Sequence, residues 1–215
     1  MQNLIRKLIV AILISLAPFH AARAVDIKGD IMTQPVAVGE FTLTDQNGKT
    51  FDATALSNGW SLVYFGFTNC GHICPVHMLQ ISKFYRELEA RPTDDKNLPR
   101  VIFVSVDPAR DSVEKVKSYV NGFHPDFVGL TGDEKEIARL ENFLQTQHKA
   151  NLSRNGSYQV DHSSLLYLIN PQREFVASFY PPFYIDNLVK DYLAVLGSQP
   201  GHSSTQPLAA LNVIQ

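Results

Sequence analysis

Two kinds of hydrophobic pattern alternate along the chain. Continuous apolar runs, typical of strands buried on both faces of a sheet, occupy residues 61–67, 101–106 and 164–169. Apolar residues at a spacing close to 3.6, typical of amphipathic helices, occur at residues 75–88 and 185–196. Because strand and helix patterns alternate, the sequence predicts an α/β protein.

Turn and capping signals supply the remaining elements. Asn47 and Gly48 separate two short alternating runs, which predicts an N-terminal β-hairpin. Capping boxes that open at Asp111 and Thr131 each predict the start of a helix. The other predicted elements are strands at residues 127–130 and 174–179, an extended entry segment at residues 25–38, and an inserted loop or short hairpin at residues 145–157.

The predicted order of elements is a hairpin, three strand–helix pairs, and then an antiparallel hairpin with a closing helix. A parallel βαβ start followed by an antiparallel hairpin is the plan of thioredoxin-like folds. We therefore expect a central mixed sheet flanked by helices and preceded by the N-terminal β-hairpin.

The N-terminal residues 1–24 have the pattern of a secretory signal peptide. Two basic residues precede an apolar run at residues 8–17, and residues 22–24 read Ala-Arg-Ala, a cleavage pattern. The apolar run is shorter than the roughly 20 residues that span a bilayer, so a membrane partner is expected only if the leader stays uncleaved. We expect one domain at residues 25–196, a loose tail at residues 197–215, and a periplasmic location.

Composition and charge narrow the range of partners. The chain has 215 residues and is 45% hydrophobic, which suits a single domain with a sizeable core. Its formal net charge is −2 at pH 7, and it lacks a basic block interleaved with aromatic residues. Nucleic acid is therefore not an expected partner.

The two cysteines of the chain, Cys70 and Cys74, follow the apolar run at residues 61–67. Pro75 suits the first turn of a helix, because its fixed φ and missing N–H are tolerated there. Backbone N–H groups and the helix dipole at such a junction favour thiolate over thiol. The pair is a candidate metal site, a redox pair or a static disulfide. Redox thioredoxins have two residues between their cysteines, whereas this chain has three.

A histidine far along the chain is a candidate third member of the site. His162 precedes the apolar run at residues 164–169, and in this topology that run lies beside the strand that leads to Cys70. The imidazole can therefore face the thiols and supply a nitrogen ligand. The alternative is a hydrogen-bonded structural histidine.

Three separated segments closely resemble the Sco/SenC family. Residues 65–70 read Phe-Gly-Phe-Thr-Asn-Cys and are followed by Cys74-Pro75; residues 105–112 read Ser-Val-Asp-Pro-Ala-Arg-Asp-Ser; and residues 160–163 read Val-Asp-His-Ser. The resemblance covers about residues 41–196. It implies a fold similar to that of thioredoxins and peroxiredoxins, and a role in assembling the copper centre of cytochrome oxidase.

The resemblance also implies a ligand set. One copper ion, as Cu(I) or Cu(II), is expected on Cys70, Cys74 and His162, for delivery to a copper-receiving oxidase subunit or another periplasmic thiol protein. Thiolates suit Cu(I), and an added imidazole makes the site acceptable to Cu(II). Asp161 is a candidate for orienting nearby donors, and Asp107 for shaping the pocket or serving as a turn residue.

One departure from the family pattern leaves other functions open. The family usually has Pro-Asp after the first cysteine, whereas this chain has Gly71-His72. His72 can stabilise a thiolate, which makes a disulfide more oxidising, or it can become an alternative ligand. His77 is expected to be solvated. The alternatives to a non-enzymatic copper chaperone are a thiol–disulfide oxidoreductase acting on exported cysteine pairs and a redox or copper sensor.

Overall fold

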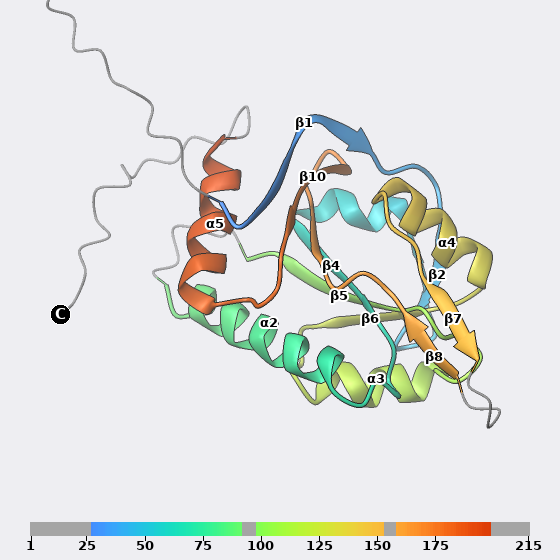
Figure 1. Ribbon diagram of the computed structural model, residues 1–215. Helices are drawn as coiled ribbons and strands as arrows, with labels where there is room; N and C mark the ends of the chain where they lie inside the picture. Colours follow the sequence, from blue (N-terminus) through green and yellow to red (C-terminus); the bar gives the residue numbers. More distant parts are fainter. Residues whose placement is uncertain (1–26, 92–97, 153–157, 199–215) are drawn as a thin grey trace, which may run out of the picture.

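The computed structural model of the chain describes residues 27–91, 98–152 and 158–198 (Figure 1). The strands are β1 (Gly29–Ala37), β2 (Thr42–Asp45), β3 (Thr50–Asp52), β4 (Ser61–Gly66), β5 (Arg100–Ser105), β6 (Val128–Thr131), β7 (Lys149–Leu152), β8 (Tyr158–Asp161), β9 (Leu166–Ile169) and β10 (Glu174–Phe179). The helices are the 3₁₀ helix η1 (Ala53–Asn58) and the α-helices α2 (Ile73–Glu89), α3 (Val113–Asn121), α4 (Glu134–Phe143) and α5 (Ile185–Ser198).

A mixed sheet of eight strands, in the order β1-β10-β9-β4-β5-β6-β2-β3, forms the centre of the molecule. β4, β5 and β6 are parallel, whereas β9 pairs antiparallel with β4. Every residue of β4 is buried, as expected for a strand covered on both faces. The predicted mixed sheet and the predicted N-terminal hairpin, which is β2–β3, are confirmed.

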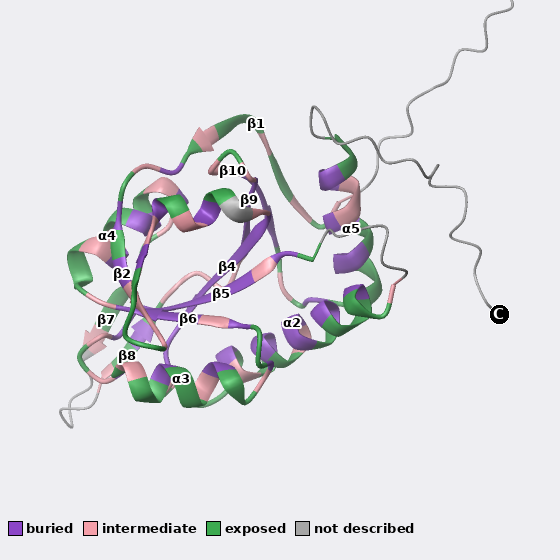
Figure 2. Ribbon diagram, turned by 180° about the vertical axis from the view of Figure 1, so that it is seen from behind, coloured by how far each residue is buried: buried purple, intermediate pink, exposed green. Residues whose placement is uncertain are grey.

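Helices cover both faces of this sheet. α2 and α3 connect the parallel strands and lie along the same side, whereas α4 lies on the other side (Figure 1). α5 packs against α2. The helices turn their buried residues inward and their exposed residues outward (Figure 2). The buried face of α2 includes Cys74, Met78 and Ile81, so the first turn of this helix faces the core.

The N-terminal part of the domain differs from the prediction. Residues 25–38 are expected as an extended entry segment, but residues 29–37 form β1, which pairs antiparallel with β10 at one edge of the sheet. The register shifts between Ile31 and Val36, and most of the strand is exposed, so no hydrophobic alternation marks it. An edge position also tolerates Pro35, because one side of an edge strand needs no ladder hydrogen bond.

The polar segment before residue 158 contributes to a hairpin. β7 and β8 pair antiparallel and form a sheet of two strands that is separate from the main sheet. The sequence left a loop and a hairpin open for residues 145–157, and the structure has the hairpin. β8 ends at Asp161, so His162 lies directly after this strand.

The expectations for the two ends of the chain remain predictions. The signal peptide at residues 1–24, and the tail beyond Ser198, lie outside the described residues. No helix in the described part of the chain combines the length and apolar character that a membrane span requires.

α3 packs closely against β6 at Gly129. A Cβ atom added to this glycine would lie 2.4 Å from Cγ1 of Val116 and 3.0 Å from Cγ1 of Val120. Both valines are buried on α3. The missing side chain therefore allows the helix to approach the strand.

We expect Gly129→Ala to lower the free energy of unfolding by about 1–3 kcal/mol, the usual cost of overpacking a core. Adding Val116→Ala should recover part of this loss, because it removes the closest atom. Gly197→Ala is the control, since nothing lies within 4 Å of its added Cβ atom and alanine favours a helix. Urea unfolding measures all three; a Gly129→Ala protein as stable as the wild type would contradict the close packing.

Candidate metal centre

The two cysteines lie at the junction between β4 and α2. The amide of Cys70 donates to the carbonyl of Phe67 over 3.2 Å, which closes a turn after the strand. α2 begins at Ile73, two residues before the predicted start, so Cys74 belongs to its first turn. The amide of Cys74 lies 3.4 Å from Sγ of Cys70. Both side chains are free thiols; Cys74 is buried and Cys70 is half-buried.

His162 contacts Cys74, the more buried of the two cysteines. Its Nε2 lies 3.3 Å from Sγ of Cys74, and its Nδ1 lies 2.8 Å from the carbonyl oxygen of Ser163. A carbonyl only accepts hydrogen bonds, so Nδ1 carries the proton and Nε2 presents its lone pair to the sulfur. Burial lowers the pKa of His162, which favours the neutral imidazole that a metal ligand must be.

Aromatic side chains enclose this contact. The rings of Tyr64 and Phe67 meet the imidazole of His162 edge-on, with centroids 6.3 Å and 5.9 Å away. Burial, followed by the hydrogen bond with Cys70, raises the pKa of Cys74 to about 12, although hydrogen bonds from Phe67 and Tyr64 oppose the shift. Cys74 is therefore a neutral thiol at physiological pH, and it must lose its proton to bind a metal.

His77 is not the solvated residue that the sequence predicts. It is 3% exposed, and its Nδ1 lies 3.0 Å from the hydroxyl of Tyr64. Its ring packs on Phe183 at a centroid distance of 5.1 Å, and burial lowers its pKa. The helical period could have predicted the burial of His77, because position 77 lies three residues after Cys74 on the same inward face of α2.

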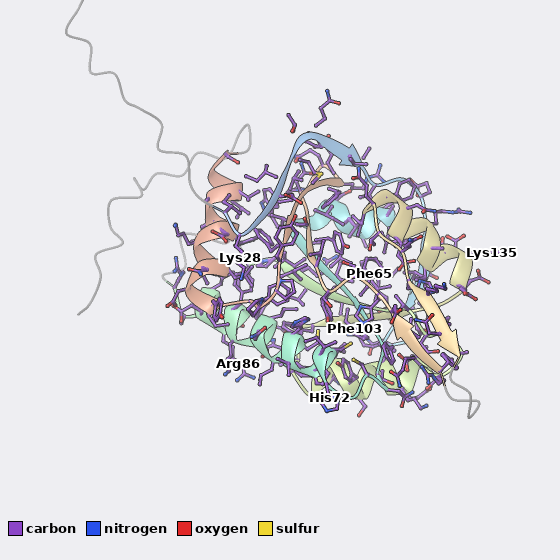
Figure 3. All side chains as sticks on the ribbon, in the orientation of Figure 1. Lys28, Phe65, His72, Arg86, Phe103 and Lys135 are labelled. Atoms are coloured by element: carbon purple, nitrogen blue, oxygen red, sulfur yellow. The ribbon has the colours of Figure 1, made fainter. Side chains whose placement is uncertain are left out.

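The two other polar candidates near the ligands point elsewhere. His72 is exposed at the start of α2 and makes no side-chain capping hydrogen bond; it projects from the surface (Figure 3). Asp161 is exposed and accepts a hydrogen bond from Asn151 on β7. Asp161 therefore serves the β7–β8 hairpin, and the carbonyl of Ser163, which sequence reasoning missed, orients His162.

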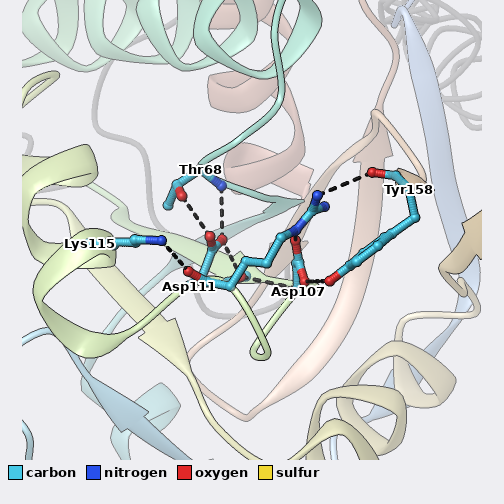
Figure 4. Close-up of polar contacts among 7 residues, drawn as sticks. Thr68, Asp107, Asp111, Lys115 and Tyr158 are labelled. Carbon is cyan, nitrogen blue, oxygen red and sulfur yellow. Dashed lines mark hydrogen bonds and ion pairs between the residues drawn. The ribbon is translucent and has the colours of Figure 1, made fainter. Parts of the chain in front are cut away.

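The turn after β5 contains two acidic residues, Asp107 and Asp111. The buried carboxylate of Asp111 accepts hydrogen bonds from the amide of Thr68 over 2.8 Å, from the hydroxyl of Thr68 over 2.6 Å and from the hydroxyl of Ser105 over 2.6 Å (Figure 4). Asp107 accepts a hydrogen bond of 2.6 Å from the hydroxyl of Tyr158 and pairs with Arg110. The hydrogen bonds of these carboxylates thus hold the loops around the cysteines.

The donor set is suitable for a soft metal but is not closed. Among residues 27–91, 98–152 and 158–198, no group of three His, Cys, Asp or Glu side chains is already arranged to hold a metal ion. Cys74 and His162 are in contact, and a third ligand requires the sulfur of Cys70 to approach them. Two thiolates and an imidazole fit copper, because thiolate is soft and imidazole serves both oxidation states.

A mixed sheet with two thiols and a neutral imidazole at one sheet edge defines a thioredoxin-like protein with a soft-metal or redox site. The SCO1/SenC family model matches residues 30–196. The chain therefore belongs to the SCO1/SenC family, as the resemblance of its motifs predicts.

Curated relatives agree with this assignment. The chain is 38% identical over 144 residues to the SCO2-like protein RP587 of Rickettsia prowazekii, a match that covers 66% of this chain and 68% of that protein. It is also 38% identical over 143 residues to the mitochondrial SCO2 homolog of Homo sapiens, covering 65% of this chain and 52% of the human protein. The chain thus spans about half the length of the human relative.

Solved structures have the same fold. Copper-bound ScoI of Arabidopsis thaliana superposes with a TM-score of 0.68 at 31% identity, covering 74% of this chain and 98% of that one. BsSco, described as a Sco-family cytochrome c oxidase assembly protein with a disulfide switch, superposes with a TM-score of 0.58 at 25% identity, covering 77% and 95%.

A buried ion pair lies beside the hairpin that leads to His162. Nδ1 of His148 lies 2.8 Å from Oε2 of Glu141, and the two side chains are 10% and 3% exposed. The hydrogen bond with Glu141 raises the pKa of His148, although burial opposes the shift. The pair joins the start of β7 to the end of α4.

The raised pKa of His148 predicts a pH dependence of stability. The contribution of the pair is complete below the unfolded pKa of about 6.5 and is lost as pH rises through the folded pKa. We therefore expect the difference in unfolding free energy between wild type and His148→Gln to shrink above about pH 6.5. The lowered pKa values of His77 and His162 give the opposite slope, but they do so in both proteins. Denaturant titrations at several pH values measure the difference; a constant difference would refute the charged pair.

Proposed function

We propose that this protein binds one copper ion through Cys70, Cys74 and His162 and delivers it during assembly of the copper centre of cytochrome oxidase. The observation that carries the proposal is the 3.3 Å approach of Nε2 of His162 to Sγ of Cys74. The donor chemistry supports it, because two thiolates hold Cu(I) and the imidazole extends the site to Cu(II).

The asymmetry of the two thiols suits a site that passes its metal on. Cys74 is 0% exposed, whereas Cys70 is half-buried. Loading releases the thiol protons, and the neutral imidazole ligates without losing one. Cys70 is then the ligand that an incoming thiol of a receiving subunit displaces first. A site with only three protein ligands leaves a position at which this exchange begins.

The relatives and the N-terminal sequence support a cellular setting for this role. Arabidopsis ScoI is known with copper bound, and BsSco is a cytochrome c oxidase assembly protein. Together with the signal-peptide pattern at residues 1–24, this supports a periplasmic protein whose partner is an exported oxidase subunit or another periplasmic thiol protein. In this role the protein transfers a metal ion and is not an enzyme.

A thiol–disulfide oxidoreductase is the second candidate, favoured by the unequal exposure of the thiols. The Cys70 thiolate would attack one sulfur of a target disulfide and release the other as a thiolate, which takes up a proton. Cys74 would then lose its proton and attack Cys70, which frees the reduced target and leaves a Cys70–Cys74 disulfide. The buried, neutral state of Cys74 opposes this second step, because the thiolate is the nucleophile.

Copper titration of the reduced protein tests the first candidate. We expect one copper per chain, and loss of stoichiometric binding in both Cys70→Ser and Cys74→Ser. His162→Ala should weaken Cu(II) by about 10–100-fold or more, but Cu(I) far less, because the two thiolates remain. His124→Gln is the histidine control. Nε2 of His124 lies 3.3 Å from Oε2 of Glu89, at the end of α2 that is far from the cysteines. Unchanged copper stoichiometry in the cysteine variants would overturn the metal site.

A glutathione titration tests the contribution of His72 to the redox alternative. His72→Asp restores the residue type usual in the family and replaces an imidazole between the cysteines by a carboxylate, which disfavours thiolate. We expect the Cys70–Cys74 disulfide of this variant to be less oxidising than that of the wild type. His72→Gln controls for the loss of the imidazole alone. If the midpoint is the same in all three proteins, His72 has no part in tuning the thiols.

A further inference from the structure

The strand that leads to His162 lies outside the main sheet. β8 pairs only with β7 in the described part of the chain, in a sheet of two strands. The backbone ladder of the main sheet therefore anchors His162 only on its C-terminal side, through β9, which begins at Leu166 and pairs with β4. On its N-terminal side, side-chain contacts between β8 and the rest of the domain must hold the segment.

Arg110 and Asp107 supply such contacts to the first residue of β8. Nη1 of Arg110 donates to the carbonyl of Tyr158 over 3.1 Å, and the guanidinium stacks over the Tyr158 ring at 3.8 Å. The hydroxyl of Tyr158 donates to Oδ1 of Asp107 over 2.6 Å, while Oδ2 of Asp107 pairs with Nε of Arg110 (Figure 4). Backbone, ring and hydroxyl of Tyr158 are thus all held by one turn.

The same turn also holds the loop that leads to the cysteines. Asp111 binds the amide and the hydroxyl of Thr68, which lies two residues before Cys70. The guanidinium of Arg110 lies 5.7 Å above the ring of Phe67, and that ring meets His162 edge-on. Residues 107–111 therefore connect the segment that carries the sulfurs with the segment that carries the nitrogen.

We propose that Arg110 and Tyr158 are positioning residues that keep His162 beside Cys74 and thereby set the affinity of the site for Cu(II) relative to Cu(I). The inference rests on the proposed function for its copper part. Two thiolates suffice for Cu(I), whereas Cu(II) depends on the imidazole. Loosening β8 therefore weakens Cu(II) binding selectively, while a loss of general stability weakens both.

Two conservative variants test the contact with matched controls. Tyr158→Phe removes only the hydroxyl, and Arg110→Lys removes the fork and the stacking plane but keeps the charge. Tyr180→Phe is the tyrosine control, because its hydroxyl donates to Asp30 away from the cysteines. Arg100→Lys is the arginine control, because its Nη1 donates to the carbonyl of Ala55 over 2.7 Å at the other end of β5.

The copper readout is the ratio of the two affinities. We expect Tyr158→Phe and Arg110→Lys to lose about tenfold in Cu(II) affinity, with altered Cu(II) spin-resonance parameters and little change in Cu(I) affinity. A tenfold selective loss raises the reduction potential of the bound copper by about 59 mV. The controls should match the wild type. Equal loss of Cu(I) and Cu(II) affinity, or an unchanged spectrum in both variants, would overturn the proposal.

A copper-free readout separates this inference from the proposed function. Nuclear Overhauser contacts between the His162 ring and the rings of Tyr64 and Phe67 report the position of the imidazole in the metal-free protein. We expect them to weaken in Tyr158→Phe and Arg110→Lys, with faster amide exchange in β8 but not in β4. Wild-type protein that fails to bind copper would end the proposed function alone. Full retention of these ring contacts in both variants would end the positioning role.

Discussion

The site depends on the contact between Sγ of Cys74 and Nε2 of His162, two groups 88 positions apart in the chain. The antiparallel pairing of β4 and β9 brings them together, because Tyr64 near the end of β4 lies opposite Leu166 at the start of β9. Cys74 follows β4 and His162 precedes β9, so both lie at the same end of these two neighbouring strands. A register slip of one residue would turn the side chains of β9 to the opposite face and displace the imidazole.

Burial gives the two groups of this contact their chemical character. The enclosed thiol of Cys74 keeps its proton, and the enclosed imidazole of His162 stays neutral. A soft metal that binds this sulfur displaces the thiol proton, whereas an incoming disulfide finds no thiolate on Cys74. Cys70 is half-buried, so a molecule outside the domain can reach its sulfur. The contact between Cys74 and His162 is thus enclosed, and Cys70 is the more accessible of the two thiols.

A short turn after β5, rather than another strand, holds together the segments that carry Cys70 and His162. Residues 107–111 follow β5 and hold the loop before Cys70 through Asp111 and the strand before His162 through Arg110. Because β7 and β8 form a separate sheet, these side-chain contacts replace backbone pairing there. The cysteines thus follow a strand of the main sheet, whereas the strand before His162 is held by side chains.

Local patterns in the sequence determined the parallel centre, the N-terminal hairpin, the helices on both faces, and the resemblance of the motifs to the Sco/SenC family. The structural features depend on periodicity and capping within a few residues, whereas the resemblance depends on the residue types of three short motifs. The edge strand β1 escaped prediction because its exposed residues have no alternation. His77 was wrongly expected in solvent, although its helical phase relative to Cys74 marks the inward face. Only the tertiary structure decided that Ser163 orients His162 and that Arg110 holds Tyr158. The contact between Arg110 and Tyr158 joins segments far apart in the chain, and the choice of Ser163 rather than Asp161 as the partner of His162 depends on where the imidazole lies. Long-range packing sets both distances.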